Sequence, residues 1–372
     1  MFTLFHKSIF ASYINRVVNS TKTYFMRNLF LLFIIFTMFL ADRAYGQKER
    51  LYNVGQQTLE LKDSIRNRPL KTEIWYPTKD SLSKKYHKTE SPYFHKPTIR
   101  NASNTIQKFP LIMLSHGTGG NRISLMWLAH ELAKNGFIVA AVDHWGNTFD
   151  NKIPLNFVKV WDRPLDVSYV ISSLITDSTF SNNIDINKIG VVGFSLGGYT
   201  SIALGGGGID YNLLKEFSNT EQGQKELNVP ELGNLSPLIT KEVIKKGNSK
   251  NKHLKDERIS VFIAMAPAIG QGFKYSLQFE NFNSPLLIIG AQNDERTPIL
   301  TNAKHYHNLI PSSEFIELEG KVGHYVFLNA AKQDLQNNLP LYFKDHETID
   351  RKFIHQKVAH FVVAFLKKNL KY

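Results

Sequence analysis

Two segments close to residue 60 alternate apolar and polar side chains with the period of a half-buried strand. They are VGQQTLELKD (54–63) and RPLKTEIWYP (68–77), and we predict that they form an antiparallel pair. The polar stretch that follows, residues 78–108, contains Pro92 and Pro97 and is expected to be a loop.

Short apolar runs then alternate with helical patterns. Helices are expected at 123–134, at 163–174, after Ser195 and in the C-terminal segment, and strands at 109–116, 137–144, 188–195, 259–267, 285–294 and 313–320. In the C-terminal helix, six apolar residues are expected to share one face: Ile354, Val358, Phe361, Val362, Phe365 and Leu366. Strands that are apolar throughout are buried on both faces. The pattern therefore predicts an α/β fold, with a mostly parallel sheet of eight strands and helices on both of its faces.

The N-terminal residues carry a different, continuous apolar pattern. Arg27 precedes the mostly apolar stretch 29–41, and small residues follow at Ala44 and Gly46. This order is typical of a secretory signal peptide, with Met26 as the expected true start and cleavage after Gly46. The apolar stretch is too short for a helix that spans a membrane, which needs about 20 residues. An N-terminal membrane anchor is the alternative interpretation.

Composition narrows the chemistry of the chain. The formal net charge is +13, and residues 1–46 hold five of the positive charges and one negative charge, so the chain from Gln47 carries about +9. The lysines are scattered apart from a concentration at 241–258. We expect a solvated basic surface, compatible with peripheral contact with anionic lipid, and no nucleic-acid partner. The absence of cysteine excludes disulfides, thiolate metal sites and a cysteine nucleophile.

The segment VVGFSLGGYT (191–200) joins a predicted strand directly to a predicted helix. It contains the pattern G-x-S-x-G with Ser195 at its centre. In a nucleophile elbow this pattern makes a sharp turn that holds the serine in a strained backbone conformation, with its oxygen above the sheet. Gly193 and Gly197 remove side chains that would crowd such a turn. A serine at this position could also be a simple helix cap, so other residues have to decide.

A serine nucleophile needs a base and a carboxylate that orients the base. In an open α/β sheet such residues follow the carboxyl ends of strands. Asp294 ends one predicted strand, and His324 lies in a glycine-flanked loop after the next. Asp294 alone could cap a helix near Pro298, and His324 is one of thirteen histidines. The order Ser195, Asp294, His324 is however that of the α/β-hydrolase fold, and it predicts a catalytic triad.

The oxyanion of an acyl-transfer intermediate needs two backbone donors. One is expected from Leu196, which follows the nucleophile, and the other from the loop SHGTGGNR (115–122), where Thr118 is the predicted donor. We interpret His116, in the same loop, as a structural hydrogen-bonding residue and not as a second base.

Residues 209–257 interrupt the alternation of strands and helices with a polar, lysine-rich insertion. It nevertheless holds more apolar side chains than a solvated loop needs: Leu213, Leu214, Phe217, Leu232, Leu235, Leu238 and Ile239. We predict that the insertion is a cap over Ser195 that sets the choice of substrate. The alternative is that it only thickens the outer layer.

Six stretches together resemble a known family. They are PLIMLSHGTGGNR, GFIVAAVDHWGNT, RPLDVSYVISSL, GVVGFSLGG, APAIGQGF and KVGHYVFL, and they are similar to the dienelactone-hydrolase-like group of α/β hydrolases, close to platelet-activating-factor acetylhydrolases. The resemblance covers nearly all of 50–370. It implies Ser195 as nucleophile, Asp294 as acid, His324 as base, and Thr118 with Leu196 as oxyanion donors.

Two departures from that group affect the interpretation. True dienelactone hydrolases use a cysteine nucleophile, which this chain lacks. The animal platelet-activating-factor enzymes take their acid after the strand that follows the elbow helix, where AMAPAIGQGF has no carboxylate, so the acid is assigned to Asp294.

These residues and the resemblance imply an exported serine esterase acting on a small-molecule or lipid ester, such as a short-chain or phospholipid acyl ester, through an acyl-enzyme. No metal or organic cofactor is implied. A peptidase or amidase on the same fold and a non-catalytic binding protein with this fold are the alternatives. The acyl group, the alcohol and the oligomeric state are not determined by the sequence.

Overall fold

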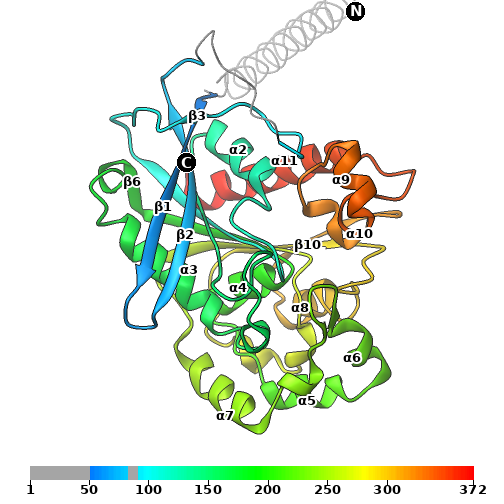
Figure 1. The fold of residues 1–372 in the computed structure, drawn as a ribbon. Helices are drawn as coiled ribbons and strands as arrows, with labels where there is room; N and C mark the ends of the chain where they lie inside the picture. The colour runs from blue at the N-terminus through cyan, green and yellow to red at the C-terminus, as the bar shows by residue number, and fades with distance from the viewer. Residues whose placement is uncertain (1–50, 83–90) are drawn as a thin grey trace, which may run out of the picture. The chain divides into compact units, whose positions relative to one another are not determined.

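The computed structural model describes residues 51–82 and 91–372, so the expected signal peptide and its cleavage site lie outside the described residues. One sheet of nine strands runs through the described chain in the order β11-β10-β9-β6-β4-β5-β2-β1-β3 (Figure 1). The strands are β1 (Asn53–Asp63), β2 (Arg68–Thr78), β3 (Ile99–Arg100), β4 (Phe109–Ser115), β5 (Ile138–Val142), β6 (Ile184–Phe194), β9 (Ile259–Met265), β10 (Leu286–Ala291) and β11 (Glu314–Leu318).

The strand directions agree with the pattern of apolar residues. β2 is antiparallel to both β1 and β5, whereas β5, β4, β6, β9, β10 and β11 run parallel to one another. All eight predicted strands are present. The two-residue strand β3 adds a ninth at the edge, because Ile99 and Arg100, in the segment expected to be a loop, pair with β1.

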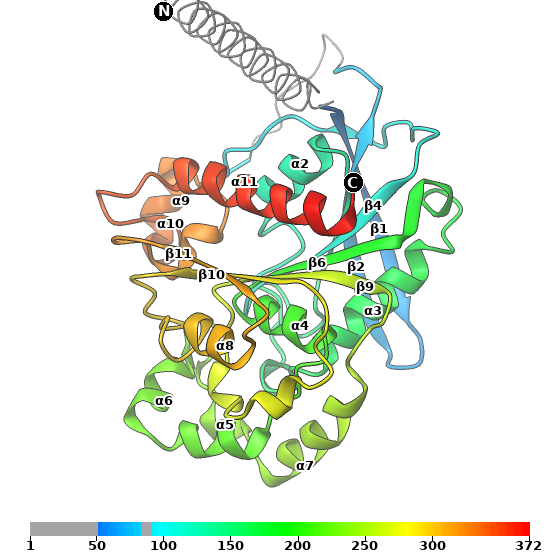
Figure 2. The ribbon, with the colours of Figure 1, turned by 180° about the vertical axis from the view of Figure 1, so that it is seen from behind.

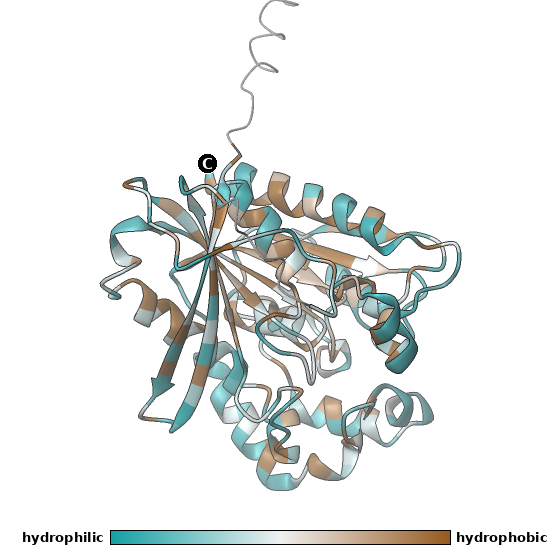
Figure 3. Ribbon diagram, turned by 45° about the horizontal axis from the view of Figure 1, so that its top comes forward, coloured by the Kyte–Doolittle hydropathy of each residue, from teal (hydrophilic) through white to brown (hydrophobic). Residues whose placement is uncertain are grey.

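Helices cover both faces of the sheet, as predicted (Figure 2). On one face lie α2 (Met126–Lys134) and α11 (Arg351–Leu370), and on the other lie α3 (Asp162–Leu174), α4 (Leu196–Leu204) and α8 (Ala303–Leu309). Hydrophobic residues concentrate along the central strands, while hydrophilic residues mark the outer sides of the helices (Figure 3). Five of the six apolar residues predicted to share a face of α11 are buried, and only Phe361 is partly exposed.

Helix α2 begins three residues later than its apolar spacing predicts. The Asn121 side chain accepts a hydrogen bond from the N–H of Ile123 (3.1 Å), and the N–H of Ser124 donates to the carbonyl of Asn121 (3.0 Å). These local bonds make a turn before the helix.

The insertion predicted at 209–257 does not continue the sheet. Its elements are α5 (Tyr211–Ser218), α6 (Glu221–Glu226), the strand pair β7 (Asn228–Val229) and β8 (Gly233–Asn234), and α7 (Lys241–Lys250). Asp210, Thr220 and Thr240 cap the three helices with their side chains. Leu214, Leu235 and Ile239 of this insertion are buried in the same core cluster as α3 and α4.

A second segment, between β11 and α11, forms short helices that the apolar pattern does not predict. It contains the 3₁₀ helix η7 (His324–Phe327) and the short helices α9 (Gln333–Asn338) and α10 (Pro340–Phe343). Figure 2 shows α9 and α10 at the β11 end of the sheet. In the described part of the chain, no helix is both long and apolar enough to cross a membrane.

Candidate active site

Ser195 occupies the turn between β6 and α4 in a backbone conformation that L-residues avoid. Its φ is 57° and its ψ is −119°. Both neighbouring glycines are required, because a Cβ atom on Gly193 would overlap the carbonyl of Gly197, and one on Gly197 would overlap the carbonyl of Ser115. The Ser195 N–H donates a hydrogen bond to the carbonyl of Met265 (2.9 Å), and the Ser195 carbonyl accepts hydrogen bonds from three later N–H groups, and these bonds hold the conformation.

The structure brings the three predicted triad residues together. The Oγ atom of Ser195 lies 3.0 Å from Nε2 of His324, and Nδ1 of His324 lies 2.7 Å from Oδ2 of Asp294. All three side chains are buried. In this network Ser195 donates its proton to Nε2, and His324 donates the Nδ1 proton to the carboxylate, which is the tautomer that a general base needs.

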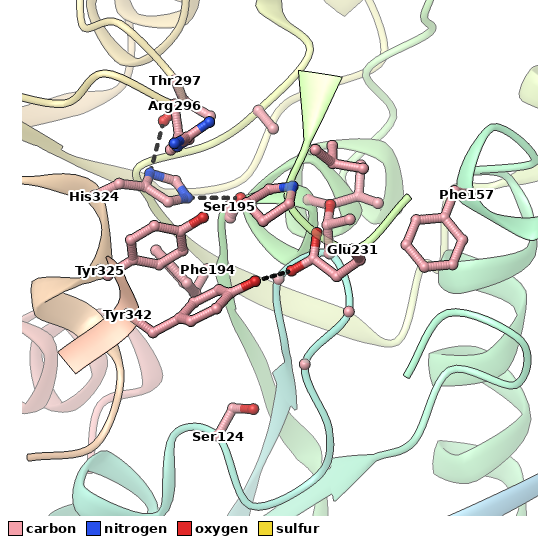
Figure 4. Close-up of a pocket in the computed structure, with 18 of the residues that line it drawn as sticks. Ser124, Phe157, Phe194, Ser195, Glu231, Arg296, Thr297, His324, Tyr325 and Tyr342 are labelled. Carbon is pink, nitrogen blue, oxygen red and sulfur yellow. Dashed lines mark hydrogen bonds between the residues drawn. The ribbon is translucent and has the colours of Figure 1, made fainter. Parts of the chain in front are cut away.

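Donors from the strand-end loop fix the carboxylate of Asp294. Its Oδ1 accepts the N–H groups of Arg296 (2.8 Å) and Thr297 (2.7 Å), and its Oδ2 lies 2.9 Å from the Thr297 hydroxyl. The same hydroxyl is 3.2 Å from Nδ1 of His324 (Figure 4). Glu295, the neighbouring carboxylate, is exposed. Sequence reasoning missed Thr297, because a threonine three residues after an aspartate carries no signal of its own.

The loop 115–122 passes beside the nucleophile. A Cβ atom on Gly117 would lie 3.1 Å from Cβ of Ser195, and the N–H of Gly119 donates to Asn147 (3.0 Å). Thr118 stands between these two glycines and lines the same cavity as Leu196. The N–H of Leu196 begins α4, where a helix has no internal acceptor for its first donors.

His116 makes hydrogen bonds with the backbone beneath this loop, in agreement with the structural role expected for it. Its Nδ1 donates to the carbonyl of Gly117 (2.7 Å), and its Nε2 accepts from the N–H of His144 (3.2 Å). Burial lowers the pKa of His116 well below its usual value. The buried guanidinium of Arg163 donates to the carbonyl of His116. Both ring nitrogens of His116 are therefore occupied.

A second serine, histidine and aspartate lie below the loop in the same hydrogen-bond order. Ser115 Oγ is 2.9 Å from Nε2 of His144, whose Nδ1 is 3.1 Å from Asp166. Burial and the charge of Arg163 lower the pKa of His144 to about 3. Burial opposes ionisation of Asp166, but hydrogen bonds from His144 and Arg68 lower its pKa to about 2. None of the three lines the cavity, so this group supports the loop and has no access to substrate.

A cavity of about 310 Å³ opens onto Ser195 and His324. One wall comes from the insertion, through Leu214, Leu227, Val229, Leu235 and Ile239. Another part of the lining comes from the segment before α11, through Tyr325, Leu328, Leu335, Leu339 and Tyr342. The described residues contain no cluster of three histidine or acidic side chains that could hold a metal ion.

The mostly parallel sheet, the strained elbow serine and the strand-end loops define the α/β-hydrolase fold. The family model described as PETase, PET hydrolase-like, matches residues 85–208, which include the loop 115–122 and Ser195. A solved ferulic acid esterase from Streptomyces cinnamoneus is similar in fold, with a TM-score of 0.56 and 19% identity, over 88% of this chain and 92% of that chain.

Two curated relatives are cutinases. Cutinase 2 of Thermobifida cellulosilytica and cutinase cut1 of Thermobifida fusca are each 24% identical to this chain over 212 residues. The aligned part is 56% of this chain and 58% and 48% of the two cutinases, so the chain spans about half the length of the curated relatives it matches. These relatives agree with the predicted superfamily. The narrower resemblance to platelet-activating-factor acetylhydrolases stays a prediction.

Proposed function

We propose that the protein is a serine hydrolase of carboxylic esters. The observation that carries the proposal is the continuous hydrogen-bonded chain from Ser195 Oγ through His324 to Asp294, on a strained elbow that faces a cavity. The names of the relatives, cutinase and ferulic acid esterase, support the choice of an ester.

The mechanism proceeds through an acyl-enzyme. His324 Nε2 takes the proton of Ser195 as Oγ attacks the ester carbonyl, and the N–H groups of Thr118 and Leu196 stabilise the negative charge on the carbonyl oxygen. Protonated His324 then gives its proton to the leaving alcohol. Water, deprotonated by His324, releases the acid and restores Ser195. Asp294 holds the imidazole in the required tautomer throughout.

The cavity favours an ester with a sizeable apolar part. Leucine, valine and isoleucine side chains of the insertion form one part of its lining, and leucine and aromatic side chains of the segment before α11 form another. We propose that residues 209–257 act as a cap that selects substrates by the size of this apolar part. The resemblance to platelet-activating-factor acetylhydrolases places short-chain and phospholipid acyl esters within this class.

The test of the esterase proposal uses pure protein beginning at Gln47. It should hydrolyse 4-nitrophenyl acetate, react with a fluorophosphonate probe, and lose about six orders of magnitude in turnover in Ser195→Ala. Faster cleavage of a matched peptide anilide than of the ester would instead make it an amidase. Absence of both turnover and labelling would favour the non-catalytic binding protein.

We further propose that the chain is exported, on the basis of the apolar stretch at 29–41 and the small residues at Ala44 and Gly46. N-terminal sequencing of protein made in its host should begin at or next to Gln47. An intact N-terminus in the membrane fraction would support the anchor, and an intact chain in the cytoplasm would contradict both interpretations.

Peripheral contact with a membrane also remains a proposal. Trp145, Phe149, Ile153 and Leu155 are exposed on the segment between β5 and α3, and Phe149 also lines the cavity. Lys152 lies over the Phe149 ring at 5.1 Å. Sedimentation with anionic vesicles should fall in Phe149→Ser if this segment touches lipid, and unchanged binding would exclude it.

A further inference from the structure

The acidic side chain of Glu231 reaches into a cavity whose lining is mostly apolar. Glu231 lies between β7 and β8 of the insertion and lines the cavity together with Ser195 and His324. Its Cγ atom occupies the space above Gly119, where any Cβ would overlap it. Gly119 is next to Thr118, the proposed oxyanion donor. Figure 4 shows the carboxylate within the same cavity as the His324 ring and the Ser195 side chain.

The two oxygens of Glu231 differ in their partners. Oε1 accepts a hydrogen bond from the Tyr342 hydroxyl (3.2 Å), whereas Oε2 is buried and has no hydrogen-bond partner among the described residues. Burial raises the pKa of the Glu231 carboxyl, and hydrogen bonding by its own backbone N–H and by the Tyr342 hydroxyl opposes that rise, followed by the charges of Lys152 and Arg296. Among the described residues, neither cation forms an ion pair with Glu231. A buried acceptor without a donor is destabilising, so a ligand that supplies the missing donor is favoured.

A second glutamate of the insertion, Glu226, differs from Glu231 in its hydrogen bonds. Glu226 is also partly buried at the cavity wall, and both of its oxygens are bonded. Oε1 accepts from Gln222 (2.8 Å) and Thr301 (3.1 Å), and Oε2 accepts from Gln271 and from Asn302 (3.2 Å). Glu226 therefore joins the insertion to the body of the domain, while Glu231 keeps one oxygen free inside the cavity.

We propose that Glu231 is a specificity residue that binds a hydrogen-bond donor, a hydroxyl or an ammonium group, on the ester substrate. This inference rests on the proposed esterase function. The surrounding walls are mostly apolar and aromatic, so the donor is carried on an apolar body, and the free Oε2 accepts the hydrogen bond from the donor. A hydrogen bond to a charged acceptor is stronger than one between neutral groups, so the pairing separates such esters from purely apolar ones of equal size.

The test compares substituents of equal size. Methyl benzoates carrying a 4-ethyl, 4-hydroxymethyl or 4-aminomethyl group vary the acyl side, and benzyl acetates with the same three groups vary the alcohol side. In at least one series we expect kcat/KM for a donor ester to exceed that of the ethyl ester by about tenfold or more. A gain for both donors indicates recognition of a hydrogen bond, and a gain for the aminomethyl ester alone indicates recognition of charge.

Substitution of Glu231 assigns the preference to this residue. Glu231→Leu should reduce the donor-to-ethyl ratio to about one, and because this ratio is measured within one variant, any change in turnover that is common to both esters cancels. Glu221→Gln, an exposed change on the same insertion, is the matched control and should keep the ratio. Removal of an unsatisfied carboxylate should not lower the melting temperature, whereas loss of a structural residue would.

The outcomes separate this inference from the esterase proposal. Hydrolysis of 4-nitrophenyl acetate with no donor preference in either series, or a preference that survives Glu231→Leu, would overturn the role of Glu231 alone. Failure to hydrolyse 4-nitrophenyl acetate would overturn the esterase proposal. Calorimetry with the same ethyl and aminomethyl esters and Ser195→Ala protein measures the donor preference without turnover, and equal affinities there would also overturn the inference.

Discussion

The Nε2 atom of His324 lies 3.0 Å from the Oγ atom of Ser195, although 129 positions separate the two residues in the chain. Ser195 follows β6 and His324 follows β11, at the far edge of the sheet. The loop after β10 adds Asp294, so two neighbouring parallel strands deliver the acid and the base to the same end of the sheet as the serine. This arrangement makes the role of each residue separately testable.

Asp294→Asn should lower kcat by about 10⁴ with little change in KM, because an asparagine favours the wrong tautomer of His324. Steady-state kinetics on 4-nitrophenyl acetate measure the effect. Glu295→Gln is the control, since that side chain is exposed, and it should retain activity. A fall of less than tenfold in Asp294→Asn would mean that another group is the acid, and Glu295 would be the first to re-examine.

Gly197→Ala should prevent the elbow from forming, because the added Cβ would overlap the backbone carbonyl of Ser115. We expect the free energy of unfolding to fall by more than about 4 kcal/mol, measured by urea denaturation. At Gly208 an added Cβ would have only one contact, at 3.8 Å, so Gly208→Ala should stay within about 0.5 kcal/mol of the wild type. Equal stability of the two variants would refute the close approach seen at Gly197.

Val229→Phe tests whether the insertion selects substrates by size. Val229 lines the cavity, and a phenyl ring there should reduce kcat/KM for an octanoyl ester about tenfold relative to the acetyl ester. Ile244→Phe is the control on α7, outside the cavity lining. Point substitutions are preferable to removing 209–257, because Tyr211 and Leu214 of that segment are part of the core. A ratio that moves equally in both variants would indicate that the insertion is only scaffold.

The stability of the protein should fall as the pH drops below about 6.5, and His355 should contribute. Burial lowers the pKa of His355 from 6.5 to about 4, so the unfolded chain binds a proton that the folded chain does not between these values. His355→Gln should reduce the loss of unfolding free energy between pH 7 and pH 5 by about 2 kcal/mol. Urea denaturation at both pH values measures this. Burial also lowers the pKa of His130, to about 4, and that of His144, so the variant should keep the part of the pH dependence of stability that these two residues contribute. If the variant loses as much unfolding free energy between pH 7 and pH 5 as the wild type, His355 does not contribute.

Local pattern alone was sufficient for the eight predicted strands, for α2, α3, α4 and α11, and for the three residues proposed as the triad. Buried parallel strands are apolar on both faces, so β4, β5, β6, β9 and β10 stand out along the chain. The elbow can be recognised from the sequence because both of its required glycines and the serine fall within five consecutive residues. Asp294 and His324 could be selected because each follows such a strand, and parallel strands bring their carboxyl ends together.

Only the tertiary structure decided what surrounds these residues. Thr297, Tyr342 and Glu231 have no local signal, since their positions depend on how separate loops pack over the sheet. Ser115, His144 and Asp166 have the same residue types and the same order of hydrogen bonds as the proposed triad. They are buried beneath the loop, and for this reason a substrate cannot reach them. The second wall of the cavity, from α9 and α10, was likewise missed, because short helices without a continuous apolar face acquire their position from long-range contacts and not from their own sequence.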